Sequence, residues 1–298
     1  MTNEQEYKNF DVALKAELVE TFKVVIEFFN EHNLKWWVCG GTMLGAIRHN
    51  NIIPWDDDID LMMPREDFNK LLTLKSQLAK PYELKSPHDE GYFKCTTKIC
   101  NTSTTLWERQ RDPSSMGVFI DIFPLDSFDL TFEQYCEQHV LFKKKMRQFE
   151  LSKSRYSLSE MLSNIRENRK GALLDGVLSL FYPFAKSENY RNSFLAVEQM
   201  FNQGSGKYTA SPTGAYGTRE FYESEWFEDT IQVDFADFKV NVPKGYDSYL
   251  KVMYGDYMQL PPEEKRVTHH GQYYVNLKEN LSKDKLQIDI KNGKHLVF

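Results

Sequence analysis

Apolar residues recur at intervals of three and four along the first part of the chain. The pattern runs from Phe10 to Phe29 through Leu14, Leu18, Phe22 and Val25. This spacing places the apolar side chains on one face of a helix. It therefore predicts an amphipathic first helix that packs on a sheet.

The next stretch alternates between strand-like and helical patterns. An apolar run at Trp36–Cys39 is followed directly by Gly40-Gly41, and this pattern predicts a strand that ends in a tight turn. Residues 42–49 then have the pattern of a short helix. A second strand is expected at Ile59–Met63, and Pro64 would begin another helix.

Residues 82–123 predict strands joined by turns. The candidates are Tyr92–Ile99, Ser103–Trp107 and the apolar run Gly117–Pro124. Only one acid, Asp121, interrupts the last run. An unpaired charge in a buried strand costs roughly 3 to 5 kcal/mol, so Asp121 requires a partner. That partner is either a cation of the protein or a bound metal ion, and the acids described below favour the metal.

The pattern of residues 131–202 is helical, with Phe132, Tyr135, Phe142, Met146 and Phe149 at helix spacing. Residues 143–170 carry nine Lys or Arg against three Glu, and the apolar run 173–184 is too short to span a bilayer. The region 143–185 therefore suggests peripheral contact with an anionic membrane surface. The alternative is a solvated helix face beside an ordinary core helix.

The last third predicts a hairpin, a helix and a basic extended segment. Residues 231–234 and 238–242 form the hairpin pattern, and Gly255 would end the helix that begins near Pro243. Beyond Pro261 the chain carries Lys265, Arg266, His269 and His270. The mixed, charged stretch 281–298 predicts partial disorder.

Composition limits the classes of function. The 298 residues are 41% hydrophobic, which suffices for a packed core, and the net charge of −6 gives no general attraction to nucleic acid. The polar, acidic start does not resemble a signal peptide, so we expect a cytoplasmic protein or one peripheral at the inner face of a membrane. Four scattered cysteines predict reduced, mostly buried thiols.

Four aspartates at 56, 57, 58 and 60 are the strongest chemical signal in the chain. Side chains of a strand repeat their direction every second residue, so Asp58 and Asp60 point the same way and Asp56 can join them. Such carboxylates repel unless a cation lies between them. A calcium EF-hand is excluded because its glycine and glutamate are replaced by Leu61 and Asp67. We therefore predict a site for Mg²⁺, with Mn²⁺ as the alternative, formed by this group and Asp121.

Groups that suit phosphate surround this acidic stretch. Gly40, Gly41 and Thr42 would present backbone N–H groups at a helix start. The candidate cationic contacts are Arg48, Lys98, Lys265, Arg266 and His269 or His270. Trp55 would stack on a base or on a quaternary ammonium.

The segments GGTMLGAIRH, IPWDDDID and FIDIFPLD resemble the LicD family of the nucleotidyltransferase-fold superfamily, which includes the fukutin-related enzymes. The late segment YDSYLKVMYGDY with PPEEKR is similar to the family's C-terminal pattern. The resemblance implies an α/β (α+β) fold, a nucleotidyltransferase-like mixed β-sheet flanked by helices. It also implies Mg²⁺-dependent transfer of phosphocholine from CDP-choline to a teichoic acid, lipopolysaccharide or capsule precursor. Matched to the family, Gly40 and Gly41 are the phosphate turn, Asp58 and Asp60 the metal pair, and Asp121 the third acid.

We accordingly divide the chain into a catalytic core at 1–130, a helical subdomain at 131–205, a C-terminal completion of the core at 206–280 and a tail at 281–298. Three alternatives remain open for the function. The donor can instead be CDP-ribitol, CDP-glycerol or CDP-ethanolamine. The enzyme can transfer the nucleotide itself to a small molecule or protein. The chain can also be a glycan- or nucleotide-binding protein without catalysis.

Overall fold

The structure, a computed structural model, describes residues 2–108, 116–154, 170–268, 272–293 and 295–298. Its helices are α1 (Thr2–Glu31), α2 (Gly40–His49), α3 (Arg65–Thr73), α4 (Phe132–Lys153), α6 (Lys170–Ser179), α7 (Ser187–Glu198), α8 (Tyr246–Tyr254) and α9 (Lys283–Lys291). Its strands are β1 (Trp37–Val38), β2 (Asp60–Pro64), β3 (Tyr82–Lys85), β4 (Thr97–Trp107), β5 (Met116–Phe128), β6 (Tyr208–Ala210), β7 (Phe221–Glu223), β8 (Thr230–Phe235), β9 (Phe238–Pro243), β10 (Tyr274–Asn276) and β11 (Leu296–Val297).

A mixed sheet forms the centre of the molecule. Its strand order is β1-β2-β5-β4-β10-β11, with β3 beside β4 and β6 joining the far end of β5 to β7. The pairs β2–β5 and β10–β11 are parallel, while β1–β2, β3–β4 and β4–β5 are antiparallel. Strands β8 and β9 form a separate hairpin. The predicted mixed α/β architecture is confirmed.

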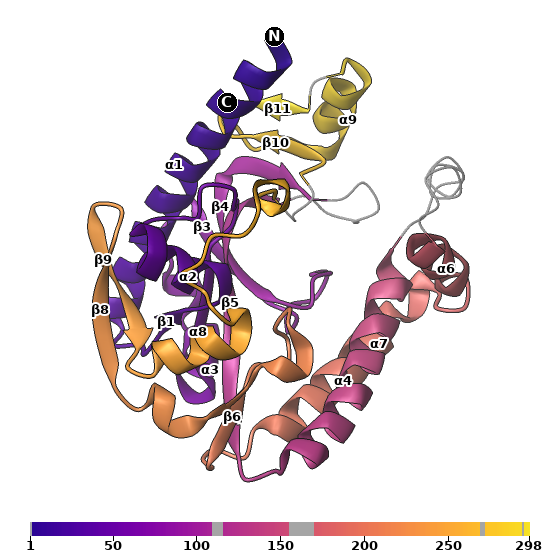
Figure 1. Ribbon diagram of the computed structural model, residues 1–298. Helices are drawn as coiled ribbons and strands as arrows, with labels where there is room; N and C mark the ends of the chain where they lie inside the picture. Colours follow the sequence, from indigo (N-terminus) through magenta and orange to yellow (C-terminus); the bar gives the residue numbers. More distant parts are fainter. Residues whose placement is uncertain (1, 109–115, 155–169, 269–271, 294) are drawn as a thin grey trace.

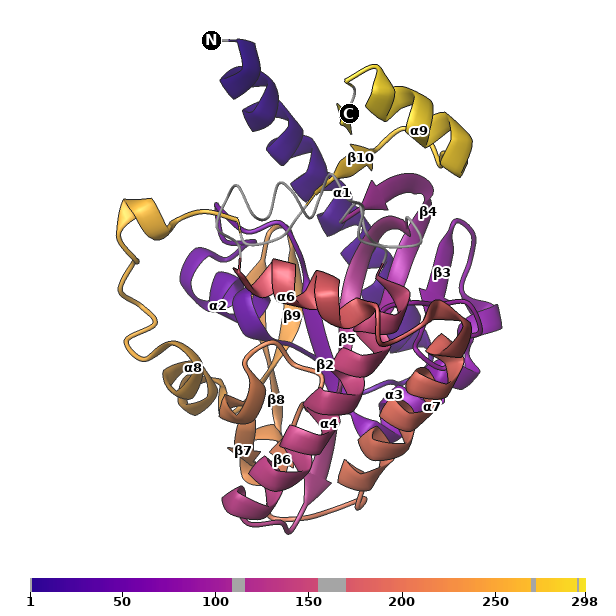
Figure 2. The same ribbon diagram turned by 90° about the vertical axis from the view of Figure 1, so that its right-hand side faces the viewer.

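Helix α1 covers one side of this sheet, and the layer of α4, α6 and α7 lies on the other (Figures 1 and 2). All six predicted apolar positions of α1, from Phe10 to Phe29, are buried. The hairpin β8–β9 and the helix α8, which ends at Gly255, also match the predicted elements. The regular periodicities of the sequence therefore located these elements correctly.

The strands between residues 82 and 107 differ from the prediction. Residues 92–96 form a loop in which the Tyr92 hydroxyl donates to the Thr96 carbonyl. The predicted strand at Ser103–Trp107 is the second half of β4, whose pairing with β5 shifts register between Asn101 and Leu106. A Cβ on Gly117 would lie 1.7 Å from the Asn101 carbonyl oxygen, so the glycine permits this irregular pairing.

The helical segment packs around aromatic side chains. Helix α4 begins with a capping box between Thr131 and Gln134. Its Tyr135, Phe142 and Phe149 are buried in a cluster with residues of α7 and the end of β5. The domain boundaries stay a prediction.

The basic run of this region falls partly outside the described residues, with Arg155, Arg166 and Arg169. Around it, Leu174, Val177, Leu180 and Phe181 of α6 and the following turn are exposed. Peripheral membrane contact stays a prediction. Across the described ranges, we find no helix with the length and apolar character needed to cross a bilayer.

The expectation of a partly disordered tail is wrong for the described residues. Ser282 caps α9 by accepting the N–H of Lys285, and β11 pairs with β10. Leu281 and Leu286 are buried against Tyr274. Trp107 of β4 also packs against this cluster and is distant in the sequence, so the local composition of the segment did not indicate that it would be ordered.

Candidate active site

The acidic stretch enters the sheet at the start of β2. Asp60 is the first residue of β2 and lies opposite Asp121 in the parallel pairing with β5. Its backbone N–H donates to the Thr42 hydroxyl at 2.8 Å, and its carbonyl accepts the Cys39 N–H at 3.0 Å. Helix α2 and the end of β1 therefore fix the position of Asp60 from both sides. Thr42, predicted as a ligand contact, is buried and serves this positioning.

The cavity beside α2 has a volume of about 700 Å³. It is lined by Asp56, Asp58 and Asp60 together with Gly41, whereas Asp57 accepts a hydrogen bond from Gln272 at 2.6 Å outside it. This division agrees with the predicted alternation, in which positions 56, 58 and 60 share a direction. The structure thus places three carboxylates at one opening.

Burial and repulsion act together on Asp60. Its pKa is raised well above the ordinary value, first because it is removed from solvent and then because Asp58, Asp121 and Asp56 are close. Lys98 opposes this shift. Four carboxylates therefore lie close to one another where the acidic stretch enters the sheet.

Asp121 has the cationic partner that the sequence required. The Nζ atom of Lys98 lies 2.7 Å from Oδ1 and 2.6 Å from Oδ2 of Asp121, in the antiparallel pairing of β4 with β5. Burial lowers the pKa of Lys98, but Asp121 outweighs this effect and the net pKa is raised. The structure therefore pairs Asp121 with Lys98, which was the alternative to metal ligation. Ligation by Asp121 stays a prediction, as does phosphate contact by Lys98.

The two glycines lie in the first turn of α2. A Cβ on Gly41 would lie 2.6 Å from Oδ2 of Asp56, so the absence of a side chain at Gly41 leaves room for this carboxylate. Gly40 has φ +52° and its N–H donates to the Tyr249 hydroxyl at 2.9 Å. One of the N–H groups predicted for phosphate is thus already bonded to the protein. The first N–H groups of a helix have no intrahelical partner, which leaves the Gly41 side of this turn as the candidate contact.

Some of the predicted cationic contacts line the cavity and others lie outside it. Arg48 and Lys265 line the cavity, and Arg48 donates to the Tyr257 carbonyl at 2.7 Å. Arg266 lies outside it, donates to the Pro261 carbonyl at 2.9 Å and places its guanidinium 5.6 Å from the Trp55 ring. His269 and His270 lie outside the described residues.

Trp55 lines the cavity, but its ring is already in contact with protein cations. The guanidinium of Arg48 lies 5.9 Å from the ring centroid, close to the 5.6 Å of Arg266. These contacts hold the loop 256–266 against the acidic stretch. Stacking of Trp55 on a ligand stays a prediction.

Four site residues were missed in the sequence: Tyr216, Glu220, Tyr249 and Tyr254. The hydroxyls of Tyr216 and Tyr254 lie 2.9 Å apart, and both rings line the cavity. Glu220 is buried and accepts the Tyr216 N–H at 2.8 Å, and burial raises the pKa of its carboxyl to about 7. The resembling segment YDSYLKVMYGDY contains Tyr249 and Tyr254, so its tyrosines could have been singled out.

The residues at this cavity fit a hard divalent cation. Among the residues that the structure describes, no group of three His, Cys, Asp or Glu is already arranged around a metal position. Mg²⁺ commonly takes one or two carboxylates and completes its shell with water and substrate phosphates. Asp60, whose ionised form is disfavoured by burial and by its acidic neighbours, offers such a pair together with Asp58.

Comparisons with known proteins show which sequences the chain resembles. A model of the LicD/FKTN/FKRP nucleotidyltransferase domain matches residues 33–161. The lipopolysaccharide cholinephosphotransferase LicD of Haemophilus influenzae is 28% identical over 259 residues, which cover 83% of this chain and 92% of that protein. The mouse and human ribitol 5-phosphate transferases FKRP are 44% identical over 50 residues, 17% of this chain and 10% of theirs. Residues 33–161 therefore match the LicD/FKTN/FKRP nucleotidyltransferase domain, and most of the chain is similar to a LicD cholinephosphotransferase.

Proposed function

We propose that the protein transfers a phospho-alcohol, in the first place phosphocholine from CDP-choline, to a hydroxyl of a cell-surface glycan precursor. The observation that carries the proposal is the cavity in which Asp56, Asp58 and Asp60 face Tyr216 and Tyr254. Carboxylates suit a cation-bound diphosphate, and aromatic faces suit a quaternary ammonium. The names of the relatives, a cholinephosphotransferase and a ribitol 5-phosphate transferase, supply the reaction class.

In this proposal the donor lies in the acidic cavity, where Asp58 and Asp60, with Asp56 beside them, would hold the Mg²⁺. The ion, or Mn²⁺ in its place, supplies neutralisation of the diphosphate charge. Lys265 lies at the same opening and can contact a phosphate oxygen. Trp55, Tyr216 and Tyr254 contribute apolar walls that limit the access of water.

Asp121 is the candidate general base. Lys98 fixes the position of its carboxylate, and it lies beside Asp60 on the neighbouring strand. The acceptor hydroxyl attacks the phosphorus of the phospho-alcohol, a new P–O bond forms, and the hydroxyl proton passes to an Asp121 oxygen. The P–O bond to the nucleotide breaks, and CMP leaves with the electron pair.

The test compares CDP-choline, CDP-ribitol, CDP-glycerol and CDP-ethanolamine as donors with a lipid-linked glycan precursor in the presence of Mg²⁺. Phospho-alcohol transfer releases CMP, which chromatography measures directly. Transfer should stop when EDTA removes the metal and resume when Mg²⁺ is added back. Release of pyrophosphate from a nucleoside triphosphate, with a nucleotide attached to the acceptor, would instead establish nucleotidyl transfer.

A further inference from the structure

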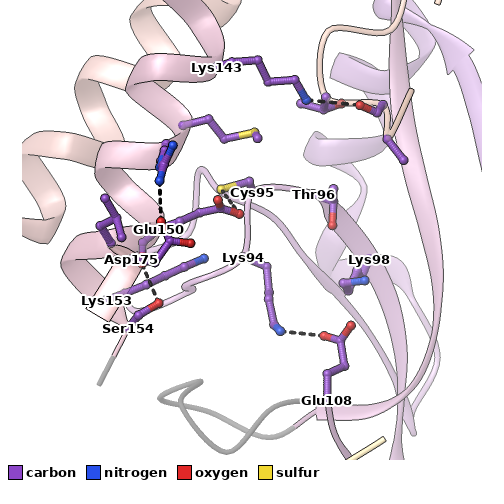
Figure 3. A pocket seen from close by; sticks show the side chains of 16 residues that line it. Lys94, Cys95, Thr96, Lys98, Glu108, Lys143, Glu150, Lys153, Ser154 and Asp175 are labelled. Atoms are coloured by element: carbon purple, nitrogen blue, oxygen red, sulfur yellow. Dashed lines mark hydrogen bonds and ion pairs between the residues drawn. The ribbon is translucent and has the colours of Figure 1, made fainter. Parts of the chain in front are cut away.

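A second cavity, of about 520 Å³, lies between α4 and the sheet (Figure 3). Its charged lining comes from α4, α6, β4 and the residues just before and after β4. The cations are Lys94, Lys98, Lys143, Arg147 and Lys153, and the carboxylates are Glu108, Glu150 and Asp175. In an acidic protein this surplus of cations is a local feature of one cavity.

Most of these cations have carboxylate partners. Lys94 lies 2.6 Å from Glu108, Arg147 forms an ion pair with Asp175, and Lys98 holds Asp121. Each pair leaves little net charge for a ligand.

Lys143 and Lys153 are different because backbone carbonyls hold their ammonium groups. Lys143 Nζ lies 3.2 Å from the Gly214 oxygen, and Lys153 Nζ donates to the Phe93 oxygen. Within the described ranges, neither lysine has a carboxylate at ion-pair distance. Glu150 also lines the cavity and accepts a weak hydrogen bond from the Cys95 thiol. Among the charged groups of the lining that form no ion pair, two ammonium groups therefore stand against one carboxylate.

Burial of an ammonium group without a counter-ion is unfavourable. It lowers the pKa of Lys143, although the negative charges of Glu220 and Glu150 act in the other direction. An anion bound in the cavity would relieve this penalty. Lys143 and Lys153 are ten residues apart on α4, about 15 Å along the helix axis, so the cavity suits an extended polar molecule.

The cavity adjoins the reaction centre. Ala215 lines both this cavity and the acidic one, and Lys98 reaches from its wall to Asp121. A hydroxyl bound here would approach Asp121 while the donor occupies the acidic cavity. Direct transfer requires that donor and acceptor be bound side by side, and two adjacent cavities provide this arrangement.

We propose that this second cavity binds the acceptor, and that the acceptor is an extended glycan whose anionic sugars are recognised separately by Lys143 and Lys153. The acceptor role rests on the transferase function proposed above. The anion can be a sugar phosphate or a uronate, and both present charged oxygens to an ammonium group.

Calorimetry with glucose 6-phosphate, glucuronate and neutral glucose tests the anion site. We expect one of the two anions, or both, to bind and glucose not to bind. The replacement Lys143→Met should weaken binding about tenfold. The matched control is Lys144→Met, since Lys144 is the next residue of α4, is exposed and does not line the cavity. Lys143→Arg should retain binding, and thermal unfolding verifies that each variant is folded.

The proposal is overturned if glucose binds as well as the anions, or if Lys144→Met weakens binding as much as Lys143→Met. It is also overturned if CDP-choline displaces the anion competitively, because both would then occupy the acidic cavity. Binding of CDP-choline with Mg²⁺ is measured separately on the same variants. Its absence would contradict the proposed function, while a Lys143-dependent anion site would remain.

Discussion

Strand β5 carries two buried aspartates whose surroundings differ. Asp121 and Asp126 are five residues apart, so they project from opposite faces of the strand. The Arg65 guanidinium binds both oxygens of Asp126 at 2.7 Å and also reaches Glu198 at 3.3 Å. Asp121 shares its face with Asp60 and has Lys98 as partner. The first group joins α3, β5 and α7, while the second lies at the acidic cavity.

The difference lies in the charges that surround each carboxylate. Around Asp126, one guanidinium with fixed geometry satisfies both oxygens of the carboxylate, although burial still raises the pKa of Asp126 and Glu198. Around Asp60, the carboxylates of Asp58, Asp121 and Asp56 repel its charge, and burial together with this repulsion raises the pKa of Asp60 well above its ordinary value. The Asp126 group holds the fold together, whereas the crowded carboxylates beside the cavity suit a cation. The same residue type thus has two roles on one strand.

Removal of the charge at Asp126 should have the largest effect on stability. Asp126→Asn leaves the buried Arg65 without its bidentate partner, and we expect the free energy of unfolding to fall by about 3 to 5 kcal/mol. Urea denaturation measures the change. The control Asp234→Asn removes an exposed pair with Lys239 and should change stability by at most about 1 kcal/mol. Equal losses of unfolding free energy in the two variants would show that Asp126 does not have the structural role assigned to it.

The replacement Asp60→Asn should lower activity without lowering stability, in contrast to Asp126→Asn. Transfer should fall by about a hundredfold or more, because the carboxylate that faces the donor loses its charge. The free energy of unfolding should stay the same or rise, since repulsion with Asp58 and Asp121 is relieved. CMP release and urea denaturation provide the two measurements. Asp57→Asn is the matched control because Asp57 faces away from the cavity, and a loss of stability in Asp60→Asn like that of Asp126→Asn would contradict the comparison.

Local patterns in the sequence predicted these carboxylates but not all of their partners. The period of two in residues 56–60 correctly placed Asp56, Asp58 and Asp60 together and Asp57 apart. The pair Lys98–Asp121 depends on the register of β4 on β5, which residue spacing does not determine. Contacts across longer separations were also missed, such as Gly40 with Tyr249 and Tyr216 with Tyr254. Periodicity predicts which side chains of one segment point the same way. The partner of a charged side chain depends on which strands and helices pack together, and periodicity does not predict this.

Glu220 is an intermediate case, with one backbone donor and no ion pair among the described residues. Its pKa rises from 4.5 to about 7 on folding, chiefly through burial. As the pH rises from 4.5 to 7, the unfolded chain loses the proton first, so the folded state becomes less stable across this window. At about 1.4 kcal/mol per pKa unit the loss is up to about 3 kcal/mol above pH 7.

The replacement Glu220→Gln should therefore change the pH profile of stability. The amide oxygen can still accept the Tyr216 N–H, but the side chain no longer ionises. We expect the variant to match the parent near pH 4.5 and to exceed it by up to about 3 kcal/mol above pH 7. Urea denaturation at a series of pH values measures the difference. Parallel profiles for the two proteins would show that Glu220 does not titrate in this window.

The smallest expected effect concerns the position of Asp56 in the acidic group at the cavity. In Gly41→Ala the new Cβ would meet the Asp56 carboxylate oxygen at 2.6 Å, and this partly exposed side chain can rotate away. Stability should change little or rise by up to about 1 kcal/mol, because alanine favours the helix. Binding of Mg²⁺ with CDP-choline should weaken by about tenfold, as for other groups that support a metal site. In Asp56→Asn the same glycine replacement should have a smaller effect on binding, because the displaced oxygen no longer carries a full charge. If Gly41→Ala weakens binding equally in both backgrounds, the glycine acts through its backbone N–H and not through the acidic group.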